Sequence, residues 1–206
     1  MFIINKSVIN RLLKFFEVMH IPSKEERVVY LTFDDGPEEG ITGFVIDELD
    51  KFGFKATFFC RGDNAERNPK LISLLLKKGH SIGNHTYSHL HAYKVSTKEY
   101  LTDVEQADNI LYTHLFRPPH ACLTIQTWLK LRRHYHIIYW AINSGDSNLS
   151  KFDYNFSINK LKKNTRNGDV ILFHFSHRHE NETRALLPEY LKWLKENGYK
   201  GIAIKL

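Results

Sequence analysis

The stretch Val28-Val29-Tyr30-Leu31-Thr32-Phe33-Asp34-Asp35-Gly36-Pro37 sets two adjacent acids directly after an apolar run. Residues 28–33 are mostly β-branched or aromatic, which indicates an interior strand, and Gly36-Pro37 is a turn signal that ends it. Two carboxylates at the end of a buried strand repel each other, and each is costly to desolvate. A nearby cation offsets that cost, so we expect a metal ion at this strand end.

Strands and helices alternate along the rest of the chain. Further strands are expected at residues 56–60, 81–84, 116–117, 136–142, 170–173 and 201–205. Helices are expected at residues 42–51, 69–78, 125–133, 157–164 and 183–197, and Ser96 with Glu99 forms a capping box that opens another. Roughly seven such units predict a single α/β domain whose parallel sheet is closed or nearly closed as a barrel. In that architecture the chemistry lies on loops at the carboxyl ends of strands.

Composition narrows the function classes. The net charge is +6, but the lysines are scattered and form no dense block, so we expect no nucleic-acid partner. No span is long and apolar enough to cross a bilayer, so no transmembrane segment is expected. Cys60 and Cys122 lie too far apart for a zinc ribbon or a disulfide framework, and both are expected in the core or in loops.

Residues 1–26 are expected to form an amphipathic extension to a domain of residues 27–206. Charged residues interrupt the apolar N-terminal run and no small-residue cleavage site follows, so no export signal is visible. A helix over residues 7–19 is expected to pack against the domain, with membrane-surface contact as the weaker alternative. Location in the cytoplasm is the default expectation, and the cell envelope is the alternative.

His85 and His89 follow the expected strand at residues 81–84. Histidines four apart share one face of a helical turn and can reach one ion, although a single such pair arises often by chance. Together with the acid pair they supply Asp/His/His ligation, which leaves an open position for water as in catalytic zinc sites. Zinc is therefore the expected ion, with cobalt, nickel and manganese as alternatives. His91 is an alternative ligand, but its direction favours exposure.

These motifs give the chain a resemblance to the polysaccharide deacetylase family, carbohydrate esterase family 4, which includes peptidoglycan and chitin deacetylases. The resemblance runs from about residue 28 to the C-terminus. It rests on five ordered motifs, at residues 32–37, 85–89, 117–120, 140–146 and 171–174. It implies a distorted (β/α)7 barrel and a metal-dependent hydrolase that removes N-acetyl groups from amino sugars of a polysaccharide or oligosaccharide.

The resemblance also divides the acid pair into two roles. It implies that Asp34 is the catalytic base, while Asp35, His85 and His89 hold the metal. Such an ion lowers the pKa of water from about 15.7 toward about 7, so a nearby carboxylate can take its proton. Arg117 matches the arginine that orients the base through a charged hydrogen bond.

The remaining implied roles concern the leaving group and the oxyanion. His174 matches the general acid that protonates the departing amine, and histidine titrates in the useful range. Asp146 matches the aspartate that contacts this histidine and raises its pKa. The backbone amide of His120, next to Pro118, matches the group that helps to hold the oxyanion. His177 and His179 follow in a polar loop and are expected at the rim of the site.

The chain departs from the family pattern at positions around the site. Asn143 and Phe175 stand where acids are common, and Ser147 stands where an aromatic residue is usual. His120 and Ala121 replace a common aromatic residue and a common glycine. None of these changes removes an implied metal ligand, the base or the acid. We therefore expect activity to be retained and the groove walls, hence the substrate, to differ.

Two alternatives to N-deacetylation remain. An O-deacetylase acting on an acetylated polysaccharide would use the same site with an easier leaving group. A non-catalytic carbohydrate-binding protein on a decayed enzyme fold is the other alternative, and the intact base, acid and ligand positions argue against it.

Overall fold

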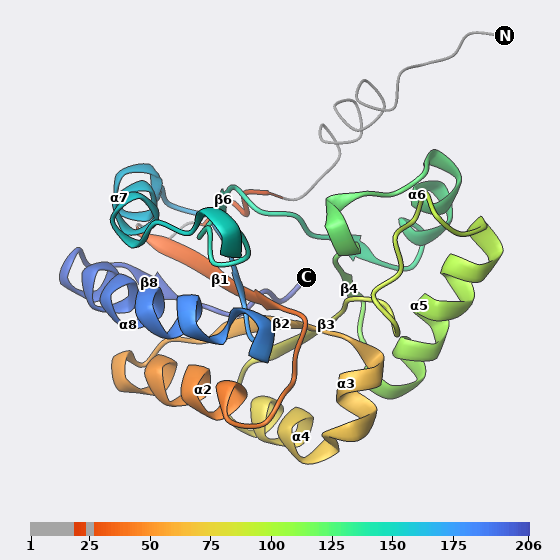
Figure 1. The fold of residues 1–206 in the computed structure, drawn as a ribbon, viewed down its shortest axis with the longest axis horizontal. Coiled ribbons are helices and arrows are strands. Elements are labelled where there is room, and N and C mark those ends of the chain that lie inside the picture. Colours follow the sequence, from red (N-terminus) through yellow and green to blue (C-terminus); the bar gives the residue numbers. More distant parts are fainter. Residues whose placement is uncertain (1–18, 24–26) are drawn as a thin grey trace, which may run out of the picture.

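The computed structural model describes residues 19–23 and 27–206, and its strands form one eight-stranded sheet (Figure 1). The order is β5-β4-β3-β2-β1-β7-β6, and β8 pairs with the beginning of β1. All pairings between these strands are parallel. The strands are β1 (Val28–Asp34), β2 (Ala56–Cys60), β3 (Ser81–Asn84), β4 (Leu115–Phe116), β5 (His136–Ile137), β6 (Ile142–Asn143), β7 (Val170–His174) and β8 (Lys200–Gly201).

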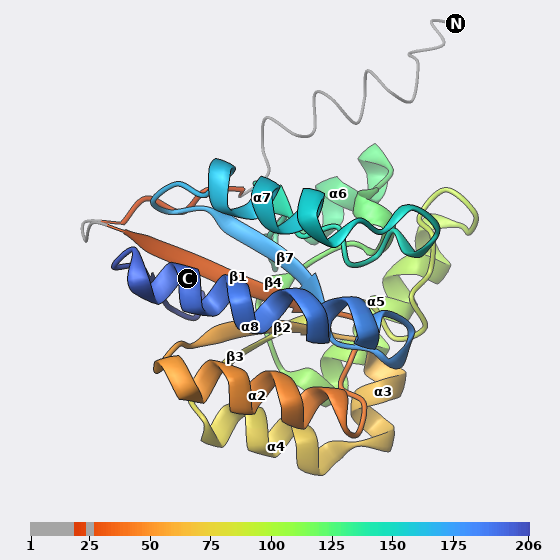
Figure 2. The same cartoon turned by 60° about the vertical axis from the view of Figure 1, so that its left-hand side comes forward.

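Seven α-helices in the described part of the chain surround this sheet (Figures 1 and 2). They are α2 (Ile41–Phe52), α3 (Gly62–Arg67), α4 (Pro69–Lys77), α5 (Thr97–Leu111), α6 (Ile125–Leu131), α7 (Tyr154–Asn164) and α8 (Glu180–Glu196). The predicted distorted (β/α)7 barrel is confirmed. It takes the form of a half-barrel, because no pairing joins the edge strands β5 and β6 in the described residues.

One predicted strand divides into two at the opening of this half-barrel. The sequence predicts a single strand over residues 136–142, but β5 pairs with β4 and β6 pairs with β7, at opposite edges of the sheet. The four residues between them therefore cross from one edge to the other. The ends of this segment still bond the flanking strands, through the Ile138 amide to the Phe116 carbonyl and the Ala141 amide to the Val170 carbonyl, each at 2.8 Å. A buried arginine described below bonds two of the segment's own carbonyls.

Strand β1 is buried along its whole length and divides its side chains between two faces. Val29, Leu31 and Phe33 pack against apolar residues of α2 and α8, which cover this side of the sheet. The alternate residues Thr32 and Asp34 face the barrel interior and a shared arginine partner. This period of two is what delivers a carboxylate to the interior end of the strand.

The helix boundaries follow the predicted end signals closely. The Ser96 hydroxyl accepts a hydrogen bond from the Glu99 amide at 3.2 Å, so α5 begins at the predicted cap. Gly198, at φ 75°, follows the end of α8 in the left-handed conformation that favours glycine. The short helix α3, of six residues, was not predicted.

Most of the predicted N-terminal extension lies outside the described residues. At its described end, the Ile21 amide donates to the Gly168 carbonyl at 2.8 Å, and the Met19 carbonyl accepts from the Val170 amide at 3.2 Å. Residues 19–21 thus continue the packing beside β7. The helix predicted over residues 7–19 and the boundary at residue 26 stay predictions. Among the described residues, no helix is both long enough and apolar enough to cross a membrane.

Candidate active site

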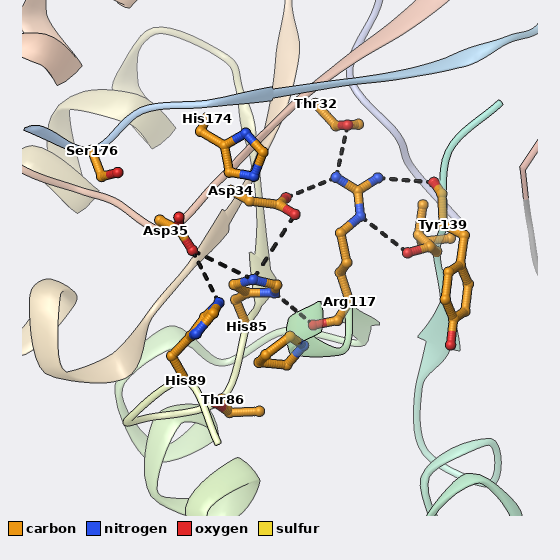
Figure 3. A network of polar contacts seen from close by, with 12 residues as sticks. Thr32, Asp34, Asp35, His85, Thr86, His89, Arg117, Tyr139, His174 and Ser176 are labelled. Atoms are coloured by element: carbon orange, nitrogen blue, oxygen red, sulfur yellow. Dashed lines mark hydrogen bonds and ion pairs between the residues drawn. The ribbon is translucent and has the colours of Figure 1, made fainter. Parts of the chain in front are cut away.

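The site lies where β1, β3, β4 and β7 end, and a buried arginine at the end of β4 organises it (Figure 3). Arg117 Nη1 donates to Asp34 Oδ1 and to Thr32 Oγ1, each at 2.8 Å. Its Nε and Nη2 donate to the carbonyls of Ile138 and Tyr139, at 3.1 and 2.9 Å. The guanidinium thus bonds two carbonyls of the segment that crosses from β5 to β6 and also holds the Asp34 carboxylate in place.

Asp35 lies one residue beyond β1 and turns toward two histidines. Its φ of 85° is in the left-handed region, which is costly for a residue other than glycine and marks a constrained position. Asp35 Oδ1 lies 3.6 Å from His85 Nε2 and 3.3 Å from His89 Nε2, and Figure 3 shows both rings pointing at this carboxylate. The adjacent acids therefore have different partners, as the sequence analysis implied.

The histidine pair is held by a loop, so the predicted helical turn is wrong. Residues 85–90 have no helical structure, and Thr86 and His89 adopt left-handed φ angles of 62° and 61°. These turns bring the two rings to a centroid distance of 5.1 Å. His85 and His89 are therefore close, as predicted, but a loop and not a helical turn brings them together.

His85 has the tautomer that a metal ligand requires. Its Nδ1 lies 2.7 Å from the Arg117 carbonyl oxygen, which can only accept, so Nδ1 carries the proton and Nε2 keeps its lone pair toward Asp35. Burial lowers the pKa of His85 to about 4, which keeps the ring neutral near pH 7. Burial alone would raise the pKa of Asp35, but contact with His89 and the other histidines lowers it below its usual range.

Asp35, His85 and His89 fit a divalent metal ion. One ligand atom from each lies within 4.8 Å of the others. Asp35 Oδ1 is buried and accepts no hydrogen bond, so this oxygen is left with an unused acceptor directed at the two imidazoles. One carboxylate and two neutral imidazoles form the donor set of a borderline ion such as zinc.

His174 closes the other side of the site at the end of β7. It is the register partner of Asp34 across the β1–β7 ladder. Its Nδ1 and its backbone amide contact the two oxygens of buried Asp146, at 2.8 and 2.7 Å. Burial lowers the pKa of His174, but the Asp146 carboxylate outweighs it and raises the pKa to about 9. The ring is therefore protonated near pH 7.

The acid pair, His85, His89 and His174 line one cavity of about 370 Å³, whereas Arg117 and Asp146 are fully buried and do not line it. Asn143, Ser147, His120 and Ala121, all predicted to alter the groove walls, do line it. The full lining comprises Asp34, Asp35, His85, His89, Pro118, His120, Ala121, Trp140, Asn143, Ser147, Leu172, His174, Arg178 and His179.

Phe175 is the exception among the departures, because it belongs to the core instead of the groove. Its ring makes an edge contact with Phe58 at a centroid distance of 5.0 Å and lies over Gly36. A Cβ on Gly36 would come within 2.4 Å of that ring. The apolar side chain thus packs behind the acid pair, which the sequence pattern alone did not reveal.

His179 lines the cavity, but it is buried more deeply than its expected place at the rim. It is only 5% exposed, and its Nδ1 lies 3.1 Å from Ser176 Oγ and 3.7 Å from Asp35 Oδ2. Its ring is tilted against that of His174 at a centroid distance of 4.7 Å. His177, two residues earlier, is exposed, pairs with Glu180 and does not line the cavity. The two histidines look alike in sequence, and only the turn of the chain between them separates their roles.

His91 is not part of the metal cluster. Its ring stacks on His120 at 4.9 Å and lies beside Cys122 Sγ, 3.7 Å from Nε2. Cys60 and Cys122 are both buried free thiols, as predicted.

Comparison with known proteins points to one family. The profile described as polysaccharide deacetylase matches residues 22–135. A peptidoglycan-N-acetylglucosamine deacetylase from Bacillus cereus is 30% identical over 185 residues, which cover 87% of each chain. The peptidoglycan-N-acetylmuramic acid deacetylase PdaC from Bacillus subtilis is 27% identical over 97% of this chain, but the chain spans only 44% of that protein.

Solved structures agree with this relationship. The peptidoglycan N-acetylglucosamine deacetylase Bc1960 superposes with a TM-score of 0.84 at 28% identity, covering 94% of this chain and 92% of that one. A family 4 carbohydrate esterase from Streptomyces lividans, solved with acetate, gives 0.78 at 25% identity, covering 87% of this chain and 93% of that one. A family pseudoenzyme from Bacillus anthracis, 20% identical over 88% of this chain and 65% of its own, shares the fold with a TM-score of 0.75.

Proposed function

Because the chain belongs to the polysaccharide deacetylase family, we propose that it is a metal-dependent hydrolase that removes N-acetyl groups from amino sugars of peptidoglycan or chitin. The observation that carries this proposal is the division of the acid pair. Asp34 is bound by Arg117 at 2.8 Å, while Asp35 faces two imidazoles. Asp34 can therefore accept a proton, and Asp35 can bind a metal ion.

Asp35, His85 and His89 would hold the ion, for which zinc is our expectation. When bound, a divalent ion supplies Lewis-acid chemistry, which polarises a carbonyl and lowers the pKa of water. The three residues come from the end of β1 and from the loop after β3, so the rigid sheet fixes their separation.

Asp34 is the base in this proposal. Its Oδ1 is occupied by Arg117, whereas its Oδ2 faces the metal ligands, 3.9 Å from His85 Nε2. The buried guanidinium bonds this carboxylate at 2.8 Å and holds its orientation. The free oxygen can therefore accept the proton of an attacking water on the ligand side of the cavity.

His174 is the acid that completes amide cleavage. An amine leaves readily only when it is protonated, and a histidine with a pKa of about 9 carries that proton near pH 7. Asp146 holds Nδ1, so the other ring nitrogen is the one that can face the substrate. The backbone amide of His120, beside Pro118 in the cavity wall, is assigned to the developing oxyanion.

Acetate release tests this proposal. Chelated protein would be incubated with N-acetylglucosamine oligomers, peptidoglycan glycan strands and acetylated xylan, each with zinc, cobalt, nickel or manganese restored. We expect acetate from an N-acetylated glycan only after metal is restored. Release from acetylated xylan alone would favour the O-deacetylase. Glycan binding without acetate release from any substrate would favour the non-catalytic alternative.

A further inference from the structure

The cavity wall contains one guanidinium that the deacetylation chemistry does not use. Arg178 lies in the 3-10 turn His177–His179, between the exposed His177 and the buried His179. Its side chain is exposed to solvent and also lines the cavity that contains Asp34 and Asp35. Arg178 therefore stands at the mouth of the proposed active site.

Within the described residues, the Arg178 guanidinium has no ion pair and no hydrogen bond. Arg184, six residues later on α8, provides a contrast. It pairs with Glu180 at 2.7 Å and lies over the ring of Phe44 at 4.4 Å. A guanidinium presents a planar fork of donors that suits a carboxylate, and that of Arg178 is unoccupied.

The charges of the cavity leave Arg178 uncompensated. The only carboxylates in the lining are Asp34, bound to Arg117, and Asp35, directed at the two histidines. Asn143 occupies a wall position at which an acid was expected, and its side-chain oxygen accepts from the Gly145 amide. Arg178 is the one lining residue with a permanent positive charge.

We propose that Arg178 binds a carboxylate that the substrate carries beside its N-acetyl group, which makes N-acetylmuramic acid the preferred sugar. This inference rests on the proposed deacetylase function. N-acetylglucosamine offers only hydroxyl groups next to its acetamido group. N-acetylmuramic acid carries a lactyl ether on the neighbouring ring carbon, and its carboxylate either is free or is amidated by a peptide that ends in a carboxylate of its own.

The test compares three substrates with the metal-loaded full chain. They are muramic acid glycans with the free lactyl carboxylate, the same glycans bearing the peptide, and N-acetylglucosamine oligomers. Arg178→Gln should raise KM for the free carboxylate about tenfold, which is the effect of one charge-assisted contact, with kcat little changed. It should leave N-acetylglucosamine oligomers unaffected. Arg184→Gln, the matched control, should leave both unchanged, and Arg178→Lys should restore part of the loss.

The peptide-bearing glycans distinguish the two carboxylate sources. If the Arg178 substitution raises KM only for the free lactyl form, the lactyl carboxylate is the group that Arg178 binds. If it raises KM for the peptide-bearing form, the carboxylate of the peptide is that group. Equal losses on charged and neutral glycans, or no preference in the wild type, would overturn the inference while leaving deacetylation intact. If no glycan is turned over, the proposed function fails. In that case the affinity of the Asp34→Asn protein for N-acetylmuramic acid and N-acetylglucosamine glycans is measured by calorimetry. Equal affinity for the two would exclude a carboxylate-binding role for Arg178.

Discussion

His174 and Asp146 are connected by two contacts, and the second one fixes the geometry of the first. The Asp146 carboxylate accepts from the ring Nδ1 and also from the backbone amide of the same histidine. Thr183 Oγ1 donates to it as well, at 3.0 Å. A carboxylate held at three points cannot rotate away, so its charge acts continuously on the imidazole.

The pH profile of an Asp146→Asn variant tests that coupling. The raised pKa of His174, about 9, means that the acid form is lost only as pH rises through 9. Removal of the Asp146 charge takes away the main influence that opposes burial, so the pKa of His174 should fall and the alkaline limb of kcat should move to lower pH. At about pH 8 we expect kcat to drop by at least about tenfold. An alkaline limb that stays in place would contradict the assignment of His174 as the acid.

Single residues were predictable from the sequence where their type is unusual for their position. Two acids after an apolar strand, or a histidine at the end of one, contradict the rules of burial and so reveal a site. His179 gave no such signal, since it lies in a polar loop beside another histidine. Its burial depends on how the 3-10 turn packs under Asp35, which is a tertiary effect.

At the scale of elements, the close approach of β2 and β3 supports the arginine. Gly83 and Phe59 are register partners, and the Phe59 ring covers the position where a Gly83 side chain would be. The Arg117 guanidinium lies 4.1 Å from the centroid of the same ring. A glycine in the strand is therefore required for the aromatic ring to lie under the guanidinium.

A Gly83→Ala variant should lose stability and activity together. Its Cβ would come within 2.3 Å of the Phe59 ring, so the ring must move, at a cost of about 1–3 kcal/mol in unfolding free energy. Gly43→Ala is the control, because this helical glycine has nothing within 4 Å of the added carbon. It should raise the unfolding free energy by about 0.5–1 kcal/mol. Chemical denaturation measures both, and equal effects would contradict the packing argument.

His80 connects the start of β2 to the segment before β3 and should make the fold sensitive to acid. Its Nδ1 accepts from the Ala56 amide at 3.2 Å, and burial lowers its pKa from 6.5 to about 4. The unfolded chain therefore binds a proton that the folded chain excludes between those pH values. The unfolding free energy should fall with pH from 6.5 to about 4, by up to about 1.4 kcal/mol per pH unit.

A His80→Asn variant removes the ring that binds this proton, while the asparagine side-chain oxygen keeps an acceptor near the Ala56 amide. Its unfolding free energy should decline less steeply than that of the wild type over the same pH window, even if it is lower near pH 7. His85, which also has a lowered pKa, is present in both proteins and cancels from the difference. Parallel curves would show that His80 is not the group responsible.

Elements were predictable where local signals agree with the tertiary structure. Strand residues 56–60 and 81–84 match β2 and β3, and the Ser96 capping box begins α5 as predicted. The strand over residues 136–142 failed because its apolar character is shared by β5, β6 and the crossing between them. Hydrophobicity reports burial, but it does not report which neighbour a strand pairs with.

For the whole molecule, Arg117 replaces the missing strand pairing at the opening of the half-barrel. It bonds the crossing carbonyls of Ile138 and Tyr139 and, through Thr32 and Asp34, the opposite strand β1. The same side chain therefore closes the barrel and orients the proposed base.

An Arg117→Lys variant distinguishes the positive charge of Arg117 from its hydrogen bonds to the segment that crosses from β5 to β6. Lysine keeps the positive charge but cannot reproduce the fork of donors, so the carbonyls of the crossing segment lose their partners. We expect the unfolding free energy to fall by about 3 kcal/mol or more and activity to fall with it. A variant with wild-type stability would contradict the closure role, whatever its activity.

The most direct test of the central claim compares the wild type with Asp34→Asn, both loaded with metal. The measurement is acetate release from an N-acetylated glycan together with the metal content of each protein. The division of the acid pair predicts that the variant loses at least about a hundredfold in turnover, as expected for removal of a general base. It also predicts an unchanged metal content, because Asp35, His85 and His89 are intact. A variant that still turns over substrate at the wild-type rate, or one that loses its metal, would contradict that division.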